Sequence, residues 1–171
     1  VGGGVRSVED VRKLLFAGAD KISINSSAIY NPSLITKASE TFGKQCIVIA
    51  IDAKQTNNKN LKSGYEFFSH GGTKETNLDA LEWAKKCVLL GAGEVLLTSM
   101  DNDGTKKGFN INLTKKITNE ISTPVIASGG VGELEHFTKG AKEANASGLL
   151  AASVFHYGKF TIQQVKKALL Q

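Results

Sequence analysis

The segment "VGGGVRSVEDV" (residues 1–11) places three glycines after an apolar residue and before the start of an amphipathic helix. The same order recurs in "SGGVGELEHF" (residues 128–137), where a glycine pair precedes a second helix start. Four strand–helix repeats separate the two segments. That spacing indicates an α/β fold of the (βα)8 TIM-barrel class with half-barrel symmetry. Strand–helix alternation alone is also compatible with an open doubly wound sheet.

The chain between and beyond these segments alternates short apolar strands with amphipathic helices. The predicted strands are "KISIN" (21–25), "CIVIAID" (46–52), "EVLLTS" (94–99), "PVIAS" (124–128) and "GLLAAS" (148–153). The predicted helices span 7–18, 31–43, 78–90, 113–121, 134–144 and 161–170. Ser7 with Asp10 forms a variant capping box, and Gly18 and Gly43 end their helices. The nearly continuous apolar runs predict strands that are buried on both faces of a parallel sheet.

Composition describes an ordinary globular protein, with 171 residues, 41% hydrophobic residues and 22% charged residues. No apolar run reaches the length of a membrane span, and the N-terminus is not a signal peptide. The net charge of +5 comes from scattered lysines, which do not form the basic stripe of a nucleic-acid groove. Cys46 and Cys87 lack metal or disulfide spacing, so we expect buried thiols in a cytoplasmic protein. We expect no metal and no cofactor.

The number of strands suggests that the barrel is incomplete. Val1 resembles the last residue of a strand, and five further strands follow it. A full barrel has typically about 250 residues. We therefore expect residues 1–171 to form a single incomplete domain, from the end of the third strand through the helix after the eighth. It would lack about two βα units at the front. Two bare edge strands would then favour association between chains.

Glycines and small polar residues follow the strands, at the end of a barrel where chemistry takes place. Backbone N–H groups there suit phosphate, and such groups occur in two sets that lie four units apart. The two sets predict a ligand with a phosphate at each end, although each glycine alone indicates only a turn. The predicted phosphate-binding residues are Gly3, Gly4, Asn25, Ser26, Asp103, Gly104, Ser128, Gly129, Gly130, Ala152 and Ser153.

Two aspartates at strand ends need separate treatment. Asp52 ends an apolar strand, and its carboxylate suits general acid–base catalysis, a helix N-cap or an ion pair with Lys54. Asp101 lies in "SMDNDGTKKGFN" (99–110), which lacks the first and last ligands of a calcium loop. A turn role suits Asp101 better, and we expect the Asp103 side chain to brace the loop. The three histidines have no zinc-binding spacing, and "SGYEFFSHGGTKETN" (63–77) predicts a hairpin, with a role as a lid left open.

The chain resembles the cyclase subunit of imidazole glycerol phosphate synthase, an enzyme family of histidine biosynthesis. The motifs that carry the resemblance are "VGGGVRSVEDVRKLLFAGADKISIN", "VIAIDAK", "GAGEVLLTSMDNDGTKKGFN", "PVIASGGVGELEHF" and "LLAASVFHYG". The resemblance implies a barrel that binds a two-phosphate ribonucleotide. Ammonia from a glutaminase subunit, docked on the opposite face, converts it into imidazole glycerol phosphate and aminoimidazole carboxamide ribotide.

The resemblance also implies roles for single residues. Asp52 matches one of two catalytic aspartates, and the predicted phosphate-binding residues match the two phosphate sites. Lys21 and Glu94 match two of four charges that gate ammonia entry, while the simpler interpretation is a surface ion pair. Asp20 would face the glutaminase. The other catalytic aspartate lies on the family's first strand, which these residues do not contain.

Two rival functions stay open from the sequence. The sister phosphoribosylformimino isomerase shares the fold and handles the preceding two-phosphate substrate, and "DGTKKG" and "IASGGV" suit either enzyme. "KISINSS", "AASVFHYG", Lys21 and Glu94 favour the cyclase. The other rival is a non-catalytic barrel fragment that binds phosphate or only associates with other chains.

Overall fold

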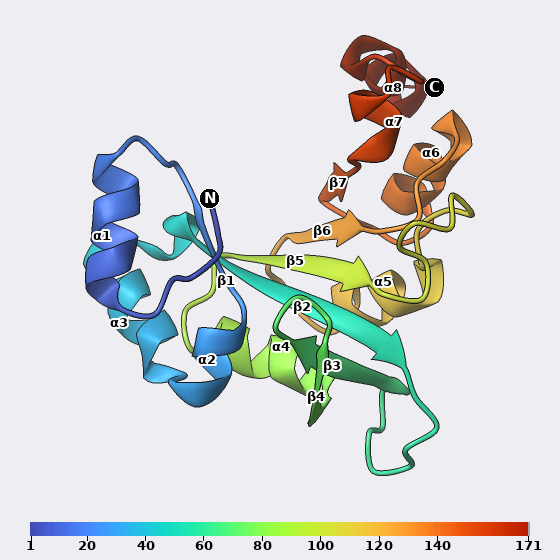
Figure 1. The fold of residues 1–171 in the computed structure, drawn as a ribbon. Helices are drawn as coiled ribbons and strands as arrows, with labels where there is room; N and C mark the ends of the chain where they lie inside the picture. Colours follow the sequence, from blue (N-terminus) through green and yellow to red (C-terminus); the bar gives the residue numbers. More distant parts are fainter. Residues whose placement is uncertain (171) are drawn as a thin grey trace.

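The computed structural model describes residues 1–170 and shows a mainly parallel sheet with helices along its outer side (Figure 1). The strands are β1 (Ile22–Ile24), β2 (Ile47–Gln55), β3 (Tyr65–Ser69), β4 (Lys74–Asp79), β5 (Glu94–Ser99), β6 (Val125–Ser128) and β7 (Gly148–Leu150). The α-helices are α1 (Val8–Phe16), α2 (Ser26–Tyr30), α3 (Ser33–Phe42), α4 (Ala80–Leu89), α5 (Ile111–Thr118), α6 (Leu134–Lys142), α7 (Ser153–His156) and α8 (Ile162–Leu169). A 3-10 turn, η1 (Lys44–Cys46), precedes β2.

The parallel strands lie side by side in chain order, as β1, β2, β5, β6 and β7. Before β1, Gly2 forms an isolated parallel bridge with Ser23, which extends this order by one position. A doubly wound sheet reverses its strand order at a switch point, whereas a barrel does not. The unreversed order therefore identifies a (βα)8-type arrangement. Within residues 1–170, β7 pairs with β6 alone, so the sheet is open at that edge.

The two faces of the sheet differ in burial, and the expectation of strands buried on both faces is wrong for these residues. In β2, the side chains of Ile47, Ile49 and Ile51 are fully buried against the helices. The alternate residues Ala50 and Asp52 are only partly buried. The alternation follows from the two-residue period of a strand, because helices cover one face and the other faces the barrel interior.

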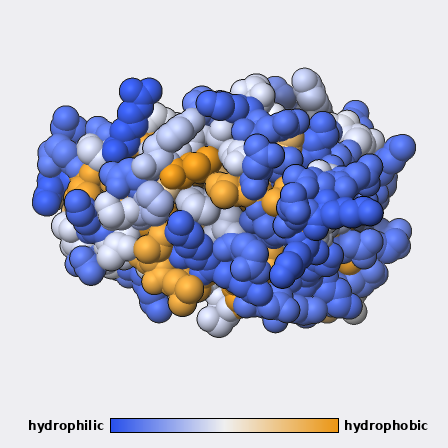
Figure 2. Space-filling model, turned by 90° about the horizontal axis from the view of Figure 1, so that it is seen from below, coloured by the Kyte–Doolittle hydropathy of each residue, from blue (hydrophilic) through white to orange (hydrophobic). Residues whose placement is uncertain are grey.

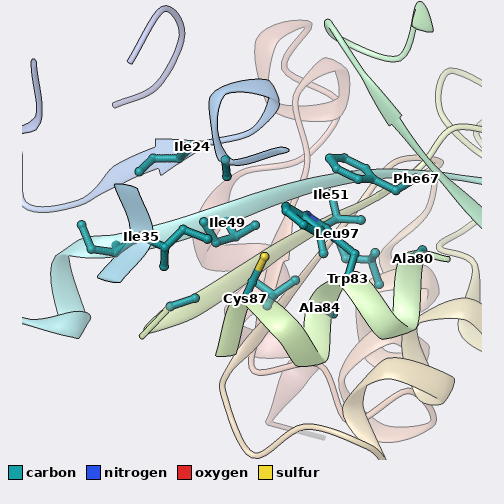
Figure 3. Close-up of a cluster of buried hydrophobic side chains, with 14 of the residues drawn as sticks. Ile24, Ile35, Ile49, Ile51, Phe67, Ala80, Trp83, Ala84, Cys87 and Leu97 are labelled. Atoms are coloured by element: carbon teal, nitrogen blue, oxygen red, sulfur yellow. The ribbon is translucent and has the colours of Figure 1, made fainter. Parts of the chain in front are cut away.

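Two apolar clusters hold the helices to the sheet. The larger one joins α1 and α3–α5 to β1, β2 and β5, and Figure 3 shows it around Ile49, Leu97 and Cys87. The smaller one joins β6 and β7 to α6–α8. In the larger cluster Trp83 stacks on Phe67 with 5.8 Å between ring centroids. Burial raises the pKa of the Cys87 thiol to about 12, whereas Cys46 is only half-buried, contrary to expectation.

The predicted hairpin within residues 63–77 is present, and it extends the sheet. Strand β2 continues past Asp52, and its last residues pair antiparallel with β3, from Asp52 opposite Phe68 to Gln55 opposite Tyr65. Strand β4 then pairs with β3. All five residues of β3 are buried. The hairpin is therefore held by the core rather than by its own turn alone.

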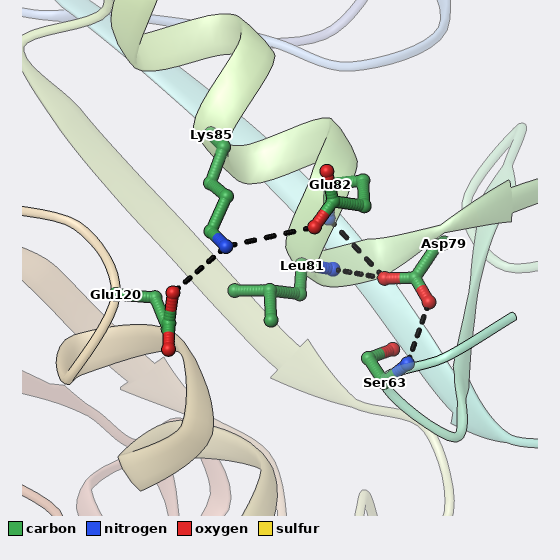
Figure 4. A network of polar contacts seen from close by, with 6 residues as sticks. All are labelled: Ser63, Asp79, Leu81, Glu82, Lys85 and Glu120. Carbon is green, nitrogen blue, oxygen red and sulfur yellow. Dashed lines mark hydrogen bonds and ion pairs between the residues drawn. The ribbon is translucent and has the colours of Figure 1, made fainter.

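Polar contacts fix the chain around the hairpin to the helices beside it (Figure 4). Asp79 caps α4 by accepting hydrogen bonds from the N–H groups of Leu81 (2.9 Å) and Glu82 (3.2 Å). Its second oxygen accepts from the N–H of Ser63 at 2.7 Å, which anchors the loop before β3. Lys85 contacts both Glu82 and Glu120, and so links α4 to the end of α5.

The surface shown in Figure 2 is mainly hydrophilic, with apolar residues in small separate groups. Exposed apolar side chains of this kind are ordinary on globular proteins. Among residues 1–170, no helix is both long and apolar enough to cross a membrane.

Candidate active site at the carboxyl ends of the strands

Two pockets open at the carboxyl ends of the parallel strands. The first pocket has a volume of about 890 Å³ and lies beside the ends of β1 and β2. Its lining residues are Gly2, Gly3, Gly4, Val5, Arg6, Ser23, Ile24, Asn25, Ser26, Ser27, Tyr30, Asn31, Ala50, Asp52, His70 and Gly71. The second pocket has about 260 Å³ and lies beside the ends of β6 and β7. Its lining residues are Asp103, Gly104, Lys106, Ser128, Gly129, Gly130, Val131, Leu150, Ala151, Ala152 and Ser153.

The structure thus divides the predicted phosphate-binding residues between the pockets as their spacing suggests. The first pocket contains Gly3, Gly4, Asn25 and Ser26. The second contains all seven of the others, which are Asp103, Gly104, Ser128, Gly129, Gly130, Ala152 and Ser153. Because the strands follow chain order, β2 and β5 separate the two sets (Figure 1).

The glycines of the first pocket border open space. Gly3 and Gly4 have φ values of 97° and 70°, in the region that favours glycine. A Cβ added at either residue would meet no heavy atom within 4 Å. Packing therefore does not explain why these residues lack side chains, and their surroundings leave room for a ligand beside the backbone.

The glycines of the second pocket differ, because two loops meet there in close contact. A Cβ at Gly129 would lie 2.8 Å from the Ser99 carbonyl oxygen, and one at Gly130 would lie 2.2 Å from that of Gly108. The Gly108 N–H donates to the Gly130 carbonyl at 2.7 Å. Loop packing alone is thus enough to require glycine at both positions.

Asn102, and not Asp103, braces the loop of residues 99–110. Its amide nitrogen donates to the Gly108 carbonyl at 2.9 Å, and its amide oxygen accepts from the Ser99 hydroxyl at 3.1 Å. The expectation that the Asp103 side chain braces the loop is therefore wrong. Asp101 has a structural role, as expected, because its carboxylate accepts from the N–H of Gln55 at 2.7 Å. This contact ties the loop to the end of β2.

Asp52 lies on β2 and lines the first pocket, and its carboxylate is held by a hydrogen-bonded chain. The Asn25 amide donates to Asp52 Oδ2 at 3.1 Å, and the Ser26 hydroxyl donates to Asn25 Oδ1 at 3.1 Å. The position inside a strand excludes the N-cap alternative. Lys54 lies over the Phe68 ring, 5.7 Å from its centroid, and no ion pair joins it to Asp52 within residues 1–170.

The surroundings of Asp52 favour its protonated form. Burial raises the pKa of this carboxyl above its usual range. The hydrogen bond from Asn25 lowers the pKa in part, and the negative charge of Asp103 raises it further. A carboxyl group with a raised pKa is better able to exchange protons near neutral pH than an exposed one.

The opposite ends of the strands carry an ion pair between Lys21, just before β1, and Glu94, the first residue of β5. The two residues lie on either side of β2 and bridge across it. The Lys21 side chain is 47% exposed and that of Glu94 is 18% exposed. The pair lies at the end of the strands remote from both pockets.

Three basic residues of the pockets do not appear among the sequence predictions. Arg6 and His70 line the first pocket and Lys106 lines the second. Arg6 follows the glycine triplet by two positions, and Lys106 lies inside the loop of residues 99–110. Both residues are therefore close in sequence to predicted phosphate-binding residues, and this proximity could have identified them. His70 is not close in sequence to any predicted site residue, because the pairing of the hairpin with β2 brings it to the pocket.

A family model for histidine biosynthesis proteins matches residues 1–161, which is most of the chain. The chain belongs to this family, whose members are (βα)8-barrel enzymes of histidine biosynthesis. The family includes both the cyclase and the isomerase of the pathway.

Proposed function

We propose that, within the histidine biosynthesis family, this chain belongs to the cyclase subunit of imidazole glycerol phosphate synthase. In this proposal it acts on a two-phosphate formimino aminoimidazole carboxamide ribonucleotide. Ammonia from a glutaminase subunit converts that substrate into imidazole glycerol phosphate and aminoimidazole carboxamide ribotide, which is a lyase reaction. The observation that carries the proposal is the pair of pockets that contain all the predicted phosphate-binding residues, with Asp52 in the first pocket on β2, the strand that pairs with β5.

Each pocket would hold one phosphate of the substrate. Gly3 and Gly4 would present backbone N–H groups in the first pocket, where the side chains of Asn25 and Ser26 add donors. In the second pocket the loop around Gly104 and the backbone near Ser153 would do the same. A substrate anchored at both ends would hold its reacting centre over β2 and β5, near Asp52.

Asp52 would exchange protons with the reacting centre as a general acid and base. Its raised pKa supports this role, and Asn25 would orient the carboxylate through the 3.1 Å hydrogen bond. The resemblance implies a second catalytic aspartate on the family's first strand. We propose that turnover needs both carboxylates in one barrel.

The Lys21–Glu94 pair favours the cyclase over the isomerase. We propose that this pair forms part of a gate for ammonia at the mouth opposite the pockets, where the glutaminase would dock near Asp20. The isomerase uses no ammonia and so has no need of such a gate. We further propose that the unpaired edge of β7 and the edge near Gly2 permit association with complementary strands.

Turnover in the presence of the family's first two βα units tests the proposed activity. The chain would be combined with a polypeptide that carries the first two βα units of a cyclase, and ammonia-dependent consumption of the substrate would be followed. We expect turnover that falls by about 10²–10⁴-fold in Asp52→Asn, as for loss of a general acid–base group. Unchanged turnover in Asp52→Asn, or a product of isomerisation, would contradict the proposal. Substrate binding without turnover would support the non-catalytic alternative.

A further inference from the structure

The tip of the β3–β4 hairpin is held against the first pocket by the rest of the fold. Strand β3 is buried along its whole length, and Phe67 within it stacks on Trp83. On β4, the N–H of Asn77 donates to the Glu66 carboxylate at 2.8 Å. These contacts fix both arms of the hairpin. The position of its tip, at residues 70–72, is therefore set by the core.

The tip contacts the wall of the first pocket through His70. The backbone N–H of His70 donates to the Ser26 hydroxyl at 2.9 Å, and its ring meets that of Tyr30 edge-on at 6.3 Å. His70 has a φ of 54°, and Gly71 and Gly72 also have positive φ values. A left-handed conformation costs a non-glycine residue roughly 1–2 kcal/mol, so a smaller or more flexible residue would fit this backbone more easily.

His70 lines the first pocket, and one nitrogen of its ring is held within the hairpin. Its Nδ1 lies 2.9 Å from the Ser69 hydroxyl, which is itself 3.3 Å from the Lys74 carbonyl. A charged ring can donate from Nδ1 to Ser69, which then donates to Lys74. A neutral ring can accept at Nδ1 from Ser69 instead. In both of these arrangements Nε2 carries a proton, whereas a neutral ring that donates from Nδ1 to Ser69 has a bare Nε2. Within residues 1–170, Nε2 has no hydrogen-bond partner, so a ligand in the pocket can take a proton from it when the ring is charged or carries its proton there.

The charges around the first pocket favour an anion at its outer side. Arg6 and His70 are the lining residues able to carry positive charge, and Asp52 is the one carboxylate. Arg6 comes from the loop before α1 and His70 from the hairpin, so the two reach the pocket from different segments. A phosphate beside Gly3 and Gly4 would have donors from both.

We propose that the hairpin tip forms the outer wall of the first pocket, and that His70 Nε2 binds the phosphate held there. The inference rests on the proposed function for the identity of the complete ligand. It goes beyond that function by assigning a binding residue to the hairpin. His70 is then a specificity-determining residue that favours a phosphate over a neutral group at this end of the substrate.

The test compares three proteins: the unmodified chain, His70→Asn and His156→Ala. Asparagine tolerates a positive φ and its side chain can still reach Ser69, but it has no atom at the position of Nε2. His156 is exposed and lies outside both pockets, so its replacement is the matched control. Binding of inorganic phosphate and of the two-phosphate ribonucleotide would be measured by calorimetry. Imidazole ¹⁵N resonances would be followed in parallel.

We expect His70→Asn to weaken binding of both ligands by about tenfold, as for a lost hydrogen bond to a charged group. His156→Ala should bind like the unmodified chain, and phosphate should shift the Nε2 resonance of His70. Equal binding by His70→Asn and the unmodified chain would overturn the inference and leave the proposed function standing. Phosphate binding that depends on His70, without ribonucleotide binding, would support the inference and contradict the proposed function. No binding of either ligand would overturn both.

Discussion

Replacing Gly130 by alanine should destabilise the protein strongly, because two costs act at this residue. Its φ of 96° is unfavourable for alanine by about 1–2 kcal/mol. The new Cβ would also lie 2.2 Å from the Gly108 carbonyl oxygen, and overpacking of this kind costs about 1–3 kcal/mol. The free energy of unfolding should therefore fall by about 2–5 kcal/mol.

Gly104→Ala is the matched control. Gly104 lines the same pocket and has a φ of 75°, but a Cβ there meets nothing within 4 Å. Only the backbone cost applies, so the expected loss is about 1–2 kcal/mol. Urea unfolding would be followed by circular dichroism rather than by tryptophan fluorescence. Trp83 belongs to the larger apolar cluster and does not report on the smaller one, which includes Val131. Equal losses for the two variants would refute the argument that loop packing fixes Gly130.

Burial and charge set the expected behaviour of Asp52, the two cysteines and Lys21. Asp52→Asn should raise the free energy of unfolding at neutral pH, because the raised folded-state pKa of Asp52 gives stability that is present at low pH and lost as pH rises through that pKa. Thermal unfolding should show this gain shrinking as pH falls through the raised pKa and absent below about pH 4, and a gain that persists there would contradict it. Iodoacetamide should label Cys46 before Cys87 in the folded protein, because the Cys87 thiol is buried and has a pKa of about 12. Mass spectrometry checks the order, and equal labelling would contradict the burial of Cys87. Lys21→Ala should change the free energy of unfolding by less than about 1 kcal/mol, since the ion pair with Glu94 is partly exposed. A larger loss in urea unfolding would show that the pair is structural.

Much of the fold was predictable because local patterns and long-range packing agree. The strand predicted at residues 94–99 matches β5, and the capping box of Ser7 and Asp10 begins α1 as expected. The differences arise at the strand ends. The strand predicted to reach Ser153 ends at Leu150, and short helices begin at Ser26 and Ser153. Neither helix has a side-chain cap that the sequence could reveal.

The members of the candidate site were predictable to the extent that they follow a strand directly. Repeat spacing placed Gly4 with Asn25, and Gly130 with Ser153, because parallel strands end at one edge. His70 was not predictable in this way, because it reaches the first pocket through antiparallel pairing remote in sequence. The brace of the loop was assigned to Asp103 instead of Asn102, since neighbouring polar residues in a turn give the same local signal.

The two pockets should bind the two phosphates of the cyclase substrate. Calorimetric titration of this chain with that ribonucleotide, and with the isomerase precursor for comparison, tests it most directly. We predict micromolar binding, about −8 kcal/mol, with a preference for the cyclase substrate. A folded chain that binds neither ribonucleotide, or that prefers the isomerase precursor, would contradict the claim.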